Sequence, residues 1–402
     1  MKQAVKKKDI GQKMSISAFK EKIGMTISDK NPDLSKSNAD KKMEWLVMPL
    51  AYEEALKIPG VPQGYVTTIC GHSNTGKSTL VNCAIAAAQK QGILPVIYDT
   101  ENNFDFSYAI DCGMKAEPVY GDVEVEVVDQ ETGEVTYVTE NRIINYTGDF
   151  LYFNQPLLAE MYGDMDYSSG KQVKTKRKQA VLEDIAYSIN TILDAQEEGD
   201  IQQGILFIWD SVGSIISYKS YASKTGNNMF DAGAVSNAFN NILNSRIPAS
   251  RKMSSQYTNS MILINKVWLD NMTNPVGPPS IELKGGRSIF YSSRLIMIVG
   301  GQLKSSVKKL TAVAKGAQYN YGIETKIKVL KNQLPTPYNI TYEGVMCCVS
   351  HGIISPTELD SYKKEHMSSI LKQIQNLRDE NNSSQENITE KDIQFTEEDS
   401  VE

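Results

Sequence analysis

Hydrophobic positions in the middle of the chain fall into short continuous runs, and segments with helical periodicity lie between them. The runs are rich in valine and isoleucine and are bounded by turn residues. Because a parallel strand covered by helices on both faces is apolar throughout, such runs predict buried parallel strands. The predicted strands are Tyr65–Cys70, Leu94–Asp99, Ile205–Asp210, Met261–Asn265 and Leu295–Val299, and the predicted helices are Lys77–Gln91, about Lys178–Gln196 and Ala232–Arg246. Repeated alternation of strand and helix indicates an α/β fold with a mostly parallel central sheet.

One segment departs from this pattern. Val123–Val127 alternates apolar and acidic residues, 129–134 contains turn residues, and Val135–Val138 returns toward alternation. Alternation on both sides of a turn predicts an antiparallel β-hairpin, inserted into the core at about 117–148. The basic run Lys171–Lys178 follows, and such a run is typical of a solvated surface.

Charge is unevenly distributed along the 402 residues. The net charge is −6, but lysines dominate up to about Lys42, and Asp379–Glu402 carries nine acidic residues against one lysine. Without that acidic tail the chain carries about +2, so the total does not exclude a nucleic-acid partner. We expect the tail to be disordered because it buries too little apolar surface to offset its ordering entropy. The expected divisions are a basic N-terminal segment over 1–43, a core over 44–355, and a C-terminal helix with the tail over 356–402.

Composition argues against several classes of protein. No apolar run approaches the roughly 18–20 residues that a membrane-spanning helix needs. The N-terminal lysines are followed by polar sequence rather than by the apolar stretch of a signal peptide. The five cysteines show no CxxC spacing, which argues against a zinc ribbon or a disulfide framework. We therefore expect a cytoplasmic protein with reduced thiols and no membrane partner.

A phosphate-binding loop follows the first predicted strand and opens the first predicted helix. It fits the pattern G-x-x-x-x-G-K-[ST]. The residues of the loop are Gly71, His72, Ser73, Asn74, Thr75, Gly76, Lys77 and Ser78, with Thr79 next. Backbone N–H groups of such a loop and of the helix N-terminus point at phosphate oxygens. We expect Lys77 to reach the β- and γ-phosphates of ATP and the Ser78 hydroxyl to bind Mg²⁺.

Acidic residues at strand ends suggest the rest of the ATP site. Ile205–Asp210 is an apolar strand that ends in a carboxylate, so Asp210 is predicted to complete the Mg²⁺ site. Hydrolysis also needs a group that orients or activates water. Asp99, at the end of its strand, and Glu101, two residues later, are equally good candidates on the residues alone.

These residues resemble those of the RecA-type recombinases, and among them the phage UvsX branch. The stretch from Asp99 to Tyr108 is similar to a family segment in which a glutamate activates water and a tyrosine seven residues later stacks on adenine. The resemblance therefore implies that Glu101 is catalytic, that Tyr108 stacks on the base and that Asp105 contacts it. It covers about Trp45 to Ile354 in the order of the motifs, with the hairpin and the basic run as insertions.

The next strand resembles one that ends in a sensor of the γ-phosphate. The sensor residues here are Asn265 and Lys266, whereas the bacterial proteins have glutamine after the asparagine and the phage branch can have histidine. Lys266 is therefore a departure from the family. We expect this cation to sense the γ-phosphate and to relay its state into the adjoining loop.

A later segment resembles one that, in a filament, reaches the ATP of the neighbouring subunit with two basic side chains. Lys331 fits the first, but Gln333 replaces the second. The second cation is expected to be lost or to come from elsewhere, for instance Lys328 or Lys315. The alternative is that these are surface lysines of a strand.

DNA contact is expected from two flexible loops after the sensor strand, Lys266–Val276 and about Gly277–Phe290. Single-stranded DNA needs cations near its phosphates and apolar or aromatic groups against its bases. Gly285–Ser292 resembles the glycine-led second DNA-binding loop of the family. The predicted DNA-binding residues are Lys284, Gly285, Gly286, Arg287 and Phe290, with Tyr291, Trp268 (equally suited to the core) and Arg294 (equally suited to a structural role) as further candidates.

The motifs and the resemblance together imply an ATP-dependent recombinase with a RecA-like ATPase core. Its protomers would form a helical filament on single-stranded DNA and pair that strand with homologous duplex DNA. The resemblance also suggests an N-terminal helix near Ser15–Lys22 that docks on a neighbour, and an acidic tail that competes with DNA. Single-strand-binding and loading proteins are expected partners, in the host cytoplasm if the chain is viral.

Two alternatives also fit the phosphate loop. A replicative helicase of the DnaB type shares the core, but it normally carries a separate domain that residues 1–44 are too short to form. A recombination mediator would bind nucleotide and partners without exchanging strands. Glu101 favours turnover over the mediator.

Overall fold

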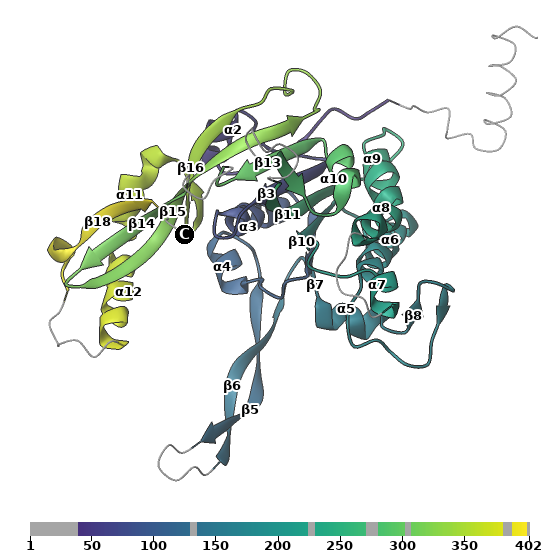
Figure 1. The fold of residues 1–402 in the computed structure, drawn as a ribbon. Coiled ribbons are helices and arrows are strands. Elements are labelled where there is room, and N and C mark those ends of the chain that lie inside the picture. The colour runs from purple at the N-terminus through teal and green to yellow at the C-terminus, as the bar shows by residue number, and fades with distance from the viewer. Residues whose placement is uncertain are drawn as a thin grey trace, which may run out of the picture.

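A large mixed sheet organises the molecule (Figure 1). The computed structural model describes residues 39–128, 135–223, 230–270, 280–301, 307–380 and 388–399. Within these residues the sheet has 12 strands, and its main path runs β17-β16-β15-β13-β3-β11-β10-β4-β7. The strands at the centre are β3 (Val66–Gly71), β4 (Leu94–Asp99), β10 (Ile205–Val212), β11 (Ser260–Asp270) and β13 (Leu295–Val299).

These five central strands are the predicted ones, and each pairs parallel with its neighbours among them. β4 and β13 begin and end where the sequence predicts. β7 (Leu151–Asn154) adds a further parallel strand beside β4. The prediction of an α/β fold with a mostly parallel central sheet is therefore confirmed.

Helices cover both faces of this sheet, and the three predicted helices are among them. α3 (Lys77–Lys90) and α2 (Leu50–Leu56) pack on one face, and α6 (Leu182–Glu198) and α8 (Phe230–Asn241) pack on the other. Successive β10 residues alternate between the two hydrophobic clusters, which is why the run is apolar throughout. No helix in the described part of the chain is long and apolar enough to cross a bilayer.

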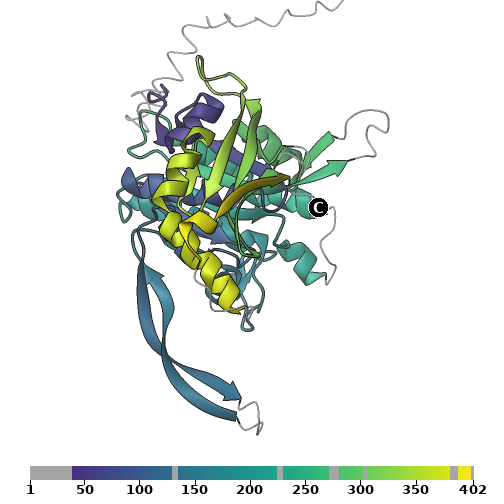
Figure 2. The ribbon, with the colours of Figure 1, turned by 90° about the vertical axis from the view of Figure 1, so that its left-hand side faces the viewer.

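The predicted hairpin insertion is present. β5 (Glu117–Val128) and β6 (Val135–Thr147) form a two-stranded antiparallel ribbon, and the predicted turn 129–134 lies outside the described residues. The ribbon projects away from the body in both views (Figures 1 and 2). The elements that follow it are α5 (Gln155–Tyr162), β8 (Met165–Asp166) and β9 (Lys171–Gln172).

The basic run is a surface, as predicted, except at Arg177. This residue is 6% exposed and its guanidinium forms an ion pair of 2.7 Å with Asp184, which is fully buried. Tyr167 and Tyr218 face the same guanidinium at 5.7 and 5.6 Å from their ring centroids. Arg177 therefore anchors the loop that carries the exposed lysines around it.

Antiparallel strands extend the sheet beyond β13. They are β14 (Val307–Ala314), β15 (Ala317–Asn332), β16 (Glu343–Val349) and β17 (Gly352–Ile354). α11 (Leu359–Glu365) and α12 (Met367–Glu380) follow, and a third hydrophobic cluster lies between these helices and the strands. The remaining elements include β1 (Trp45–Val47), β2 (Gly60–Pro62), α4 (Phe106–Asp111), α7 (Tyr218–Ala222), the π-helical turn Ile242–Arg246, α9 (Ile247–Ala249), β12 (Ser280–Leu283), α10 (Gly286–Ser292) and β18 (Gln394–Asp399).

The prediction of a disordered acidic tail is wrong for its described end. β18 pairs antiparallel with β14 over the register Val313↔Gln394 to Lys308↔Asp399. Phe395 packs into the third hydrophobic cluster, and Lys308 lies near Glu397. Backbone ladder bonds and one aromatic anchor thus order a segment whose composition alone is too polar for a core. The predicted helix near Ser15–Lys22 lies outside the described residues.

The prediction of two irregular loops after the sensor strand is also wrong in part. β11 continues to Asp270, and Val267–Asp270 pairs antiparallel with β12. Residues 286–292 form the helix α10. Ladder hydrogen bonds between β11 and β12 extend the strand up to the turn-rich sequence, of which 271–279 lies outside the described residues.

Candidate functional site

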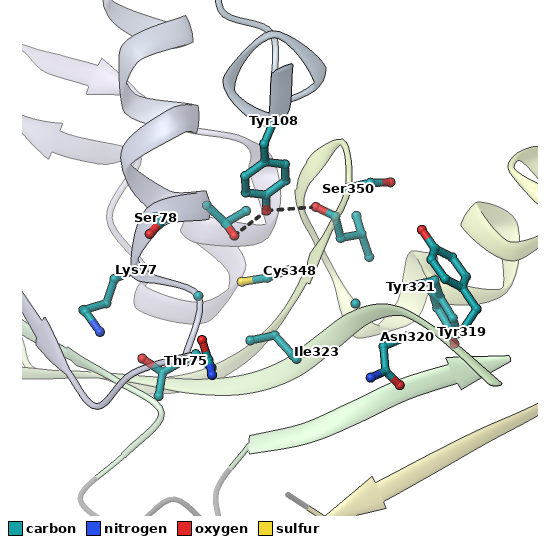
Figure 3. A pocket seen from close by; sticks show the side chains of 15 residues that line it. Thr75, Lys77, Ser78, Tyr108, Tyr319, Asn320, Tyr321, Ile323, Cys348 and Ser350 are labelled. Carbon is teal, nitrogen blue, oxygen red and sulfur yellow. Dashed lines mark hydrogen bonds between the residues drawn. The ribbon is translucent and has the colours of Figure 1, made fainter. Parts of the chain in front are cut away.

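A cavity of about 430 Å³ lies between the phosphate loop and the antiparallel strands β15 and β16 (Figure 3). Residues 74–79 of the loop and of α3 line one side, and Tyr108 of α4 lines another. The opposite wall comes from residues 319–323 and 348–350. The phosphate loop therefore opens into a pocket large enough for a nucleotide, with aromatic and backbone groups facing it.

The phosphate loop is held in a tight conformation between β3 and α3. Gly76 caps α3 with φ +99°, and a Cβ placed there would lie 2.5 Å from Cys348 Sγ. The Thr75 hydroxyl donates to the His72 carbonyl oxygen over 2.9 Å, and Lys77 Nζ donates to the same oxygen. The loop therefore needs glycine at Gly76, and the His72 carbonyl oxygen holds the Lys77 ammonium against the loop.

Asp210 lies near the end of β10, between buried Trp209 and buried Ser211, and close enough to Lys77 for their charges to interact. Burial, together with the nearby negative charges of Glu101 and Asp99, raises the pKa of Asp210 to about 6. Burial also lowers the pKa of Lys77, while the charge of Asp210 opposes that change. The Asp210 carboxylate and the Ser78 hydroxyl are hard oxygen donors, so their chemistry suits Mg²⁺.

The structure separates the two candidate catalytic carboxylates. Asp99 accepts backbone N–H groups of Glu101, Asn103 and Phe104 at 2.9–3.2 Å. It also accepts the Tyr152 hydroxyl at 3.0 Å and is 3% exposed. With four donors Asp99 shapes the loop after β4 and has little capacity left for a water molecule.

Glu101 points instead toward the ends of β10 and β11. Lys266 Nζ lies 2.8 Å from Glu101 Oε1, and the hydroxyls of Ser211 and Ser214 donate to the same oxygen, the latter over 2.7 Å. Burial opposes these donors, but together they hold the pKa of Glu101 below its ordinary value. Glu101 is thus an ionised carboxylate that is paired with the predicted sensor residue.

Tyr108 lies in the pocket, whereas Asp105 serves the helix that carries it. The Tyr108 hydroxyl shares a hydrogen bond of 2.6 Å with Thr79 and donates to the Val349 carbonyl oxygen over 3.3 Å (Figure 3). Asp105 caps α4 by accepting the Tyr108 N–H at 3.0 Å. Asp105 is not among the residues that line the cavity.

Asn265 joins the sensor strand to the predicted DNA-binding segment. Its side chain exchanges two hydrogen bonds with the backbone of Lys284, at 2.7 and 3.0 Å. The aliphatic stem of Lys284 in turn packs over Gly213, where a Cβ would lie 2.5 Å from Lys284 Cδ. Asn265 therefore braces a loop rather than lining the nucleotide cavity.

The other predicted DNA-binding residues lie at or near α10. Gly285 caps this helix with φ +88°, and Phe290 and Tyr291 at its end are exposed. Gly286 is the first residue of this helix. The side chains of Arg287 and Trp268 are outside the part of the chain that the structure describes. Lys331 donates to the carbonyl oxygens of Phe290 and Tyr291 over 2.5 and 3.3 Å, away from the nucleotide cavity of its own chain.

The two suggested substitutes for a second basic side chain are engaged elsewhere. Lys328 lies 3.3 Å from Glu343, and Lys315 lies 3.8 Å from Asp392. Arg294 lies within 3.4 Å of Gln333, the position where the cation is missing. Nothing in the described chain therefore selects Lys328 or Lys315 for that task.

Sequence reasoning missed two groups of site residues. Ser211 follows Asp210 directly and Ser214 lies four positions after it, so their nearness in the sequence to the predicted Mg²⁺ ligand is the available signal. The pocket wall formed by residues 319–323 and 348–350 comes from strands more than 200 positions from the phosphate loop. Only the pairing of β13 with β15, and of β15 with β16, brings this wall to the loop.

Comparisons with known proteins agree with this geometry. The family model of the RecA N-terminal domain matches residues 7–145. Protein RecA of Mesoplasma florum is 32% identical over 133 residues, which are 31% of this chain and 38% of that protein. Protein RecA of Roseiflexus castenholzii is 34% identical over 136 residues, 32% of this chain and 36% of that protein.

A third relative shows higher identity over a shorter stretch. Protein RecA of Chlorobaculum tepidum is 40% identical over 86 residues, 21% of this chain and 23% of that protein. The matched part of the chain thus spans well under half the length of each of these relatives. The family model and these relatives thus show that about a third of the chain, residues 7–145 in the family model, is similar to RecA proteins.

Proposed function

We propose that this protein is an ATP-dependent recombinase that assembles on single-stranded DNA and pairs that strand with a homologous duplex. The observation that carries the proposal is the meeting of a phosphate loop, Asp210 and a restrained Glu101 at the carboxyl ends of neighbouring parallel strands. The partial similarity to RecA proteins suggests the substrate class. We place the protein in the cytoplasm. The motif spacing suggests that it is nearest to the phage UvsX branch.

Residues of the phosphate loop would hold the nucleotide. The loop N–H groups and the N-terminus of α3 would receive the phosphates, and Lys77 would leave the His72 carbonyl oxygen for the β- and γ-phosphates. Ser78 and Asp210 would hold Mg²⁺, which neutralises phosphate charge when it is bound. Tyr108 would pack against the base from α4, across from residues 319–323.

Lys266 would control when Glu101 can act. The ammonium of Lys266 is paired with the carboxylate that is proposed to orient water. A γ-phosphate carries more negative charge than one carboxylate, so it would draw Lys266 away and leave Glu101 with Ser211 and Ser214. ATP binding would thus both position the sensor and release the catalytic group.

The same movement would reach the DNA-binding segment. Lys266 lies within β11, one residue before the part of the strand that pairs with β12. Its neighbour Asn265 holds the backbone of Lys284. A shift of Lys266 toward phosphate would therefore alter the segment of Lys284, Gly285, Gly286, Arg287 and Phe290, which would contact DNA.

Assembly into a filament would place Lys331 at the ATP of the adjacent copy. The ammonium of this β15 residue contacts the end of α10 and lies outside the nucleotide cavity of its own chain, which is consistent with action on a neighbour. ATP held between copies would then act mainly as an assembly switch that hydrolysis releases. Single-strand-binding and loading proteins would assist assembly in competition with other DNA-bound proteins.

DNA-dependent ATP turnover tests this proposal. We expect phosphate release to rise when single-stranded DNA is added to the wild-type protein. Lys77→Ala should abolish both turnover and strand exchange, because the lysine is the main side-chain contact to the phosphates. Wild-type-like strand exchange by Lys77→Ala, or turnover that ignores DNA, would contradict the proposal.

A further inference from the structure

The ribbon β5–β6 is the part of the molecule that the proposed function leaves without a task. Within the described residues these two strands pair only with each other. All but one residue of β6 is exposed, and the ribbon stands away from the body (Figure 2). An isolated two-stranded ribbon is marginally stable in water, and its outer edges leave backbone groups unpaired. Such an arm is suited to contact with another molecule.

The two faces of the ribbon differ in chemistry. Residues that pair across an antiparallel ladder lie on the same face. Glu124 pairs with Thr139 and Glu126 with Tyr137, so acidic and aromatic groups share one face. We define the acidic face by Tyr120, Asp122, Glu124, Glu126 and Tyr137. The two tyrosines are 60% and 69% exposed, which is unusual for side chains of this size.

The charge of the ribbon argues against a phosphate-bearing partner. Its described part carries five acidic residues (Glu117, Asp122, Glu124, Glu126 and Glu140) and one arginine. That arginine, Arg142, is already paired with Glu140 at 2.7 Å. DNA and anionic membranes would be repelled, whereas lysine side chains would gain both charge pairing and contact with tyrosine faces.

The chain itself carries a matching surface. The basic loop, which we define as Lys171, Lys174, Lys176 and Lys178, is exposed at all four lysines. No ion pair within the described residues involves any of these lysines. The buried pair of Arg177 with Asp184 holds the loop in place, so the lysines are presented from a fixed base.

We propose that the acidic face of one copy docks on the basic loop of the next copy. This inference rests on the proposed function only in that filament assembly brings copies together. Within one chain no hydrogen bond or ion pair of the described part joins the two surfaces, so their complementarity is met only between copies. In this contact four lysines would face three carboxylates and two tyrosines. Such a polar interface is suited to reversible association.

The root of the ribbon connects this contact to the nucleotide segment. Tyr146 of β6 stacks on Phe106 with ring centroids 4.4 Å apart, and Phe106 lies 4.9 Å from Phe104. The Phe104 N–H donates to Asp99, the residue that shapes the loop of Glu101. Docking of the ribbon would therefore act on the segment that carries the catalytic carboxylate and Tyr108.

Charge reversal on each side tests the inference. The variants are Glu124→Lys with Glu126→Lys, Lys174→Glu with Lys176→Glu, and all four changes together. Glu53→Lys with Glu54→Lys, on exposed positions of α2, is the matched control. Assembly on single-stranded DNA with a non-hydrolysable ATP analogue is measured by sedimentation over a range of protein concentrations.

We expect each reversal alone to raise the protein concentration needed for half-assembly by about tenfold, because like charges then oppose each other. The fourfold variant should return to within a few-fold of the wild type, and the control should not change. A ribbon variant that assembles like the wild type would overturn the inference. A fourfold variant that needs as high a protein concentration for half-assembly as the ribbon variant would also overturn it. That result would indicate that the acidic face binds a different basic protein.

A second measurement separates this inference from the proposed function. Isotope-labelled and unlabelled copies are mixed and treated with a carbodiimide, which joins carboxylates to nearby amines. Peptides of 117–142 linked to peptides of 171–178 from a different copy are expected. Their absence would overturn the docking, whereas their presence in a protein that fails to assemble on DNA would count against the proposed function alone.

Discussion

Glu101 and Asp99 have different surroundings, because the partners of Glu101 are distant in the sequence and most of those of Asp99 are local. Asp99 is surrounded by donors of its own loop, and Glu101 by Lys266, Ser211 and Ser214. The order of residues alone leaves the two carboxylates equal, since both follow the same strand. The family resemblance favours Glu101, and the four donors that Asp99 already accepts are consistent with that prediction.

The first prediction concerns Glu101→Gln. This change keeps the shape of the side chain but removes the negative charge that orients water, so phosphate release should fall about 10²–10⁴-fold. Nucleotide affinity should stay near the wild-type value, because Lys77 and Ser78 are unchanged. Steady-state phosphate release and titration with a fluorescent ATP analogue measure the two effects, with exposed Glu54→Gln as the control. Undiminished turnover would remove Glu101 from the catalytic role.

The second prediction concerns the pair of Lys266 and Glu101. Lys266→Met removes an ion pair between partly exposed groups, worth about 0.2–1 kcal/mol, so ATP turnover without DNA should rise by up to about fivefold. Stimulation by DNA should shrink because the charged sensor is lost. Lys266→Arg keeps the charge and should keep the low basal rate. Equal basal rates in Lys266→Met and the wild type would show that the pair does not restrain turnover.

The third prediction uses the raised pKa of Asp210. A carboxyl group with a pKa of about 6 in the folded state, against an ordinary 3.8, binds more protons folded than unfolded. Its contribution to the free energy of unfolding therefore falls as pH rises from about 4 to above 6. Asp210→Asn avoids the buried charge and should stabilise the nucleotide-free protein at pH 7.5 by up to about 3 kcal/mol.

Urea unfolding at several pH values checks this prediction. The gain in Asp210→Asn should narrow as pH falls from 7.5 toward 5, and exposed Asp200→Asn should show no such trend. Stabilisation by Mg²⁺ and ATP together should be lost in Asp210→Asn. A variant less stable than the wild type at pH 7.5 would contradict the inference that the buried charge of Asp210 destabilises the folded protein.

At the scale of single elements, continuous apolar runs predict the central strands well. They do not predict strands or parts of strands whose sequence is polar. β4 and β13 match their predicted bounds because burial on both faces leaves an unbroken apolar run. β11 and β18 extend into polar sequence because a neighbouring strand supplies ladder hydrogen bonds there. The residue pattern of β18 alone does not reveal that it pairs with the edge of β14.

The hairpin and the basic run show what a local residue pattern can predict and what it cannot. Strict alternation over Val123–Val127 predicts a ribbon without any knowledge of its neighbours. In the basic run, five positions look alike as cations, yet Arg177 is buried against Asp184. The signal that was available is the acidic residue near the start of the following helix, at a distance of seven positions.

The fourth prediction tests the role of Arg177. Arg177→Met keeps much of the side-chain volume but leaves the buried, negatively charged Asp184 without its cation, with only the Tyr167 hydroxyl and the Val181 N–H as donors. The free energy of unfolding should fall by about 3–5 kcal/mol, which is typical of a broken buried ion pair. Urea unfolding measures the change, and exposed Lys178→Met is the matched control. A loss below about 1 kcal/mol would contradict an anchoring role.

At the scale of the whole molecule, the C-terminal segment is part of the sheet as well as a source of charge. β18 covers the edge of β14, and Glu397 lies 3.9 Å from Lys308. Truncation of the tail would therefore expose an open strand edge in addition to removing negative charge. The proposed competition of the tail with DNA needs variants that keep the strand.

The fifth prediction follows from this arrangement. Neutralisation by Glu397→Gln, Glu398→Gln and Asp399→Asn should strengthen binding to single-stranded DNA at low Mg²⁺ and low salt, since three negative charges are removed from a strand that pairs with the strand of Lys308 and Lys309. Fluorescence anisotropy with a labelled oligonucleotide measures the affinity. Truncation after residue 387 should in addition lower the midpoint of thermal unfolding. Unchanged affinity in the neutralised variant would exclude competition by the tail.

The central claim is that ATP drives assembly of this chain into a filament on single-stranded DNA. Electron microscopy of the protein with single-stranded DNA and a non-hydrolysable ATP analogue tests it most directly. The account predicts helical filaments that require both DNA and nucleotide and that Lys77→Ala cannot form. Hexameric rings, as expected of a replicative helicase, or no assembly at all, as expected of a mediator, would contradict it.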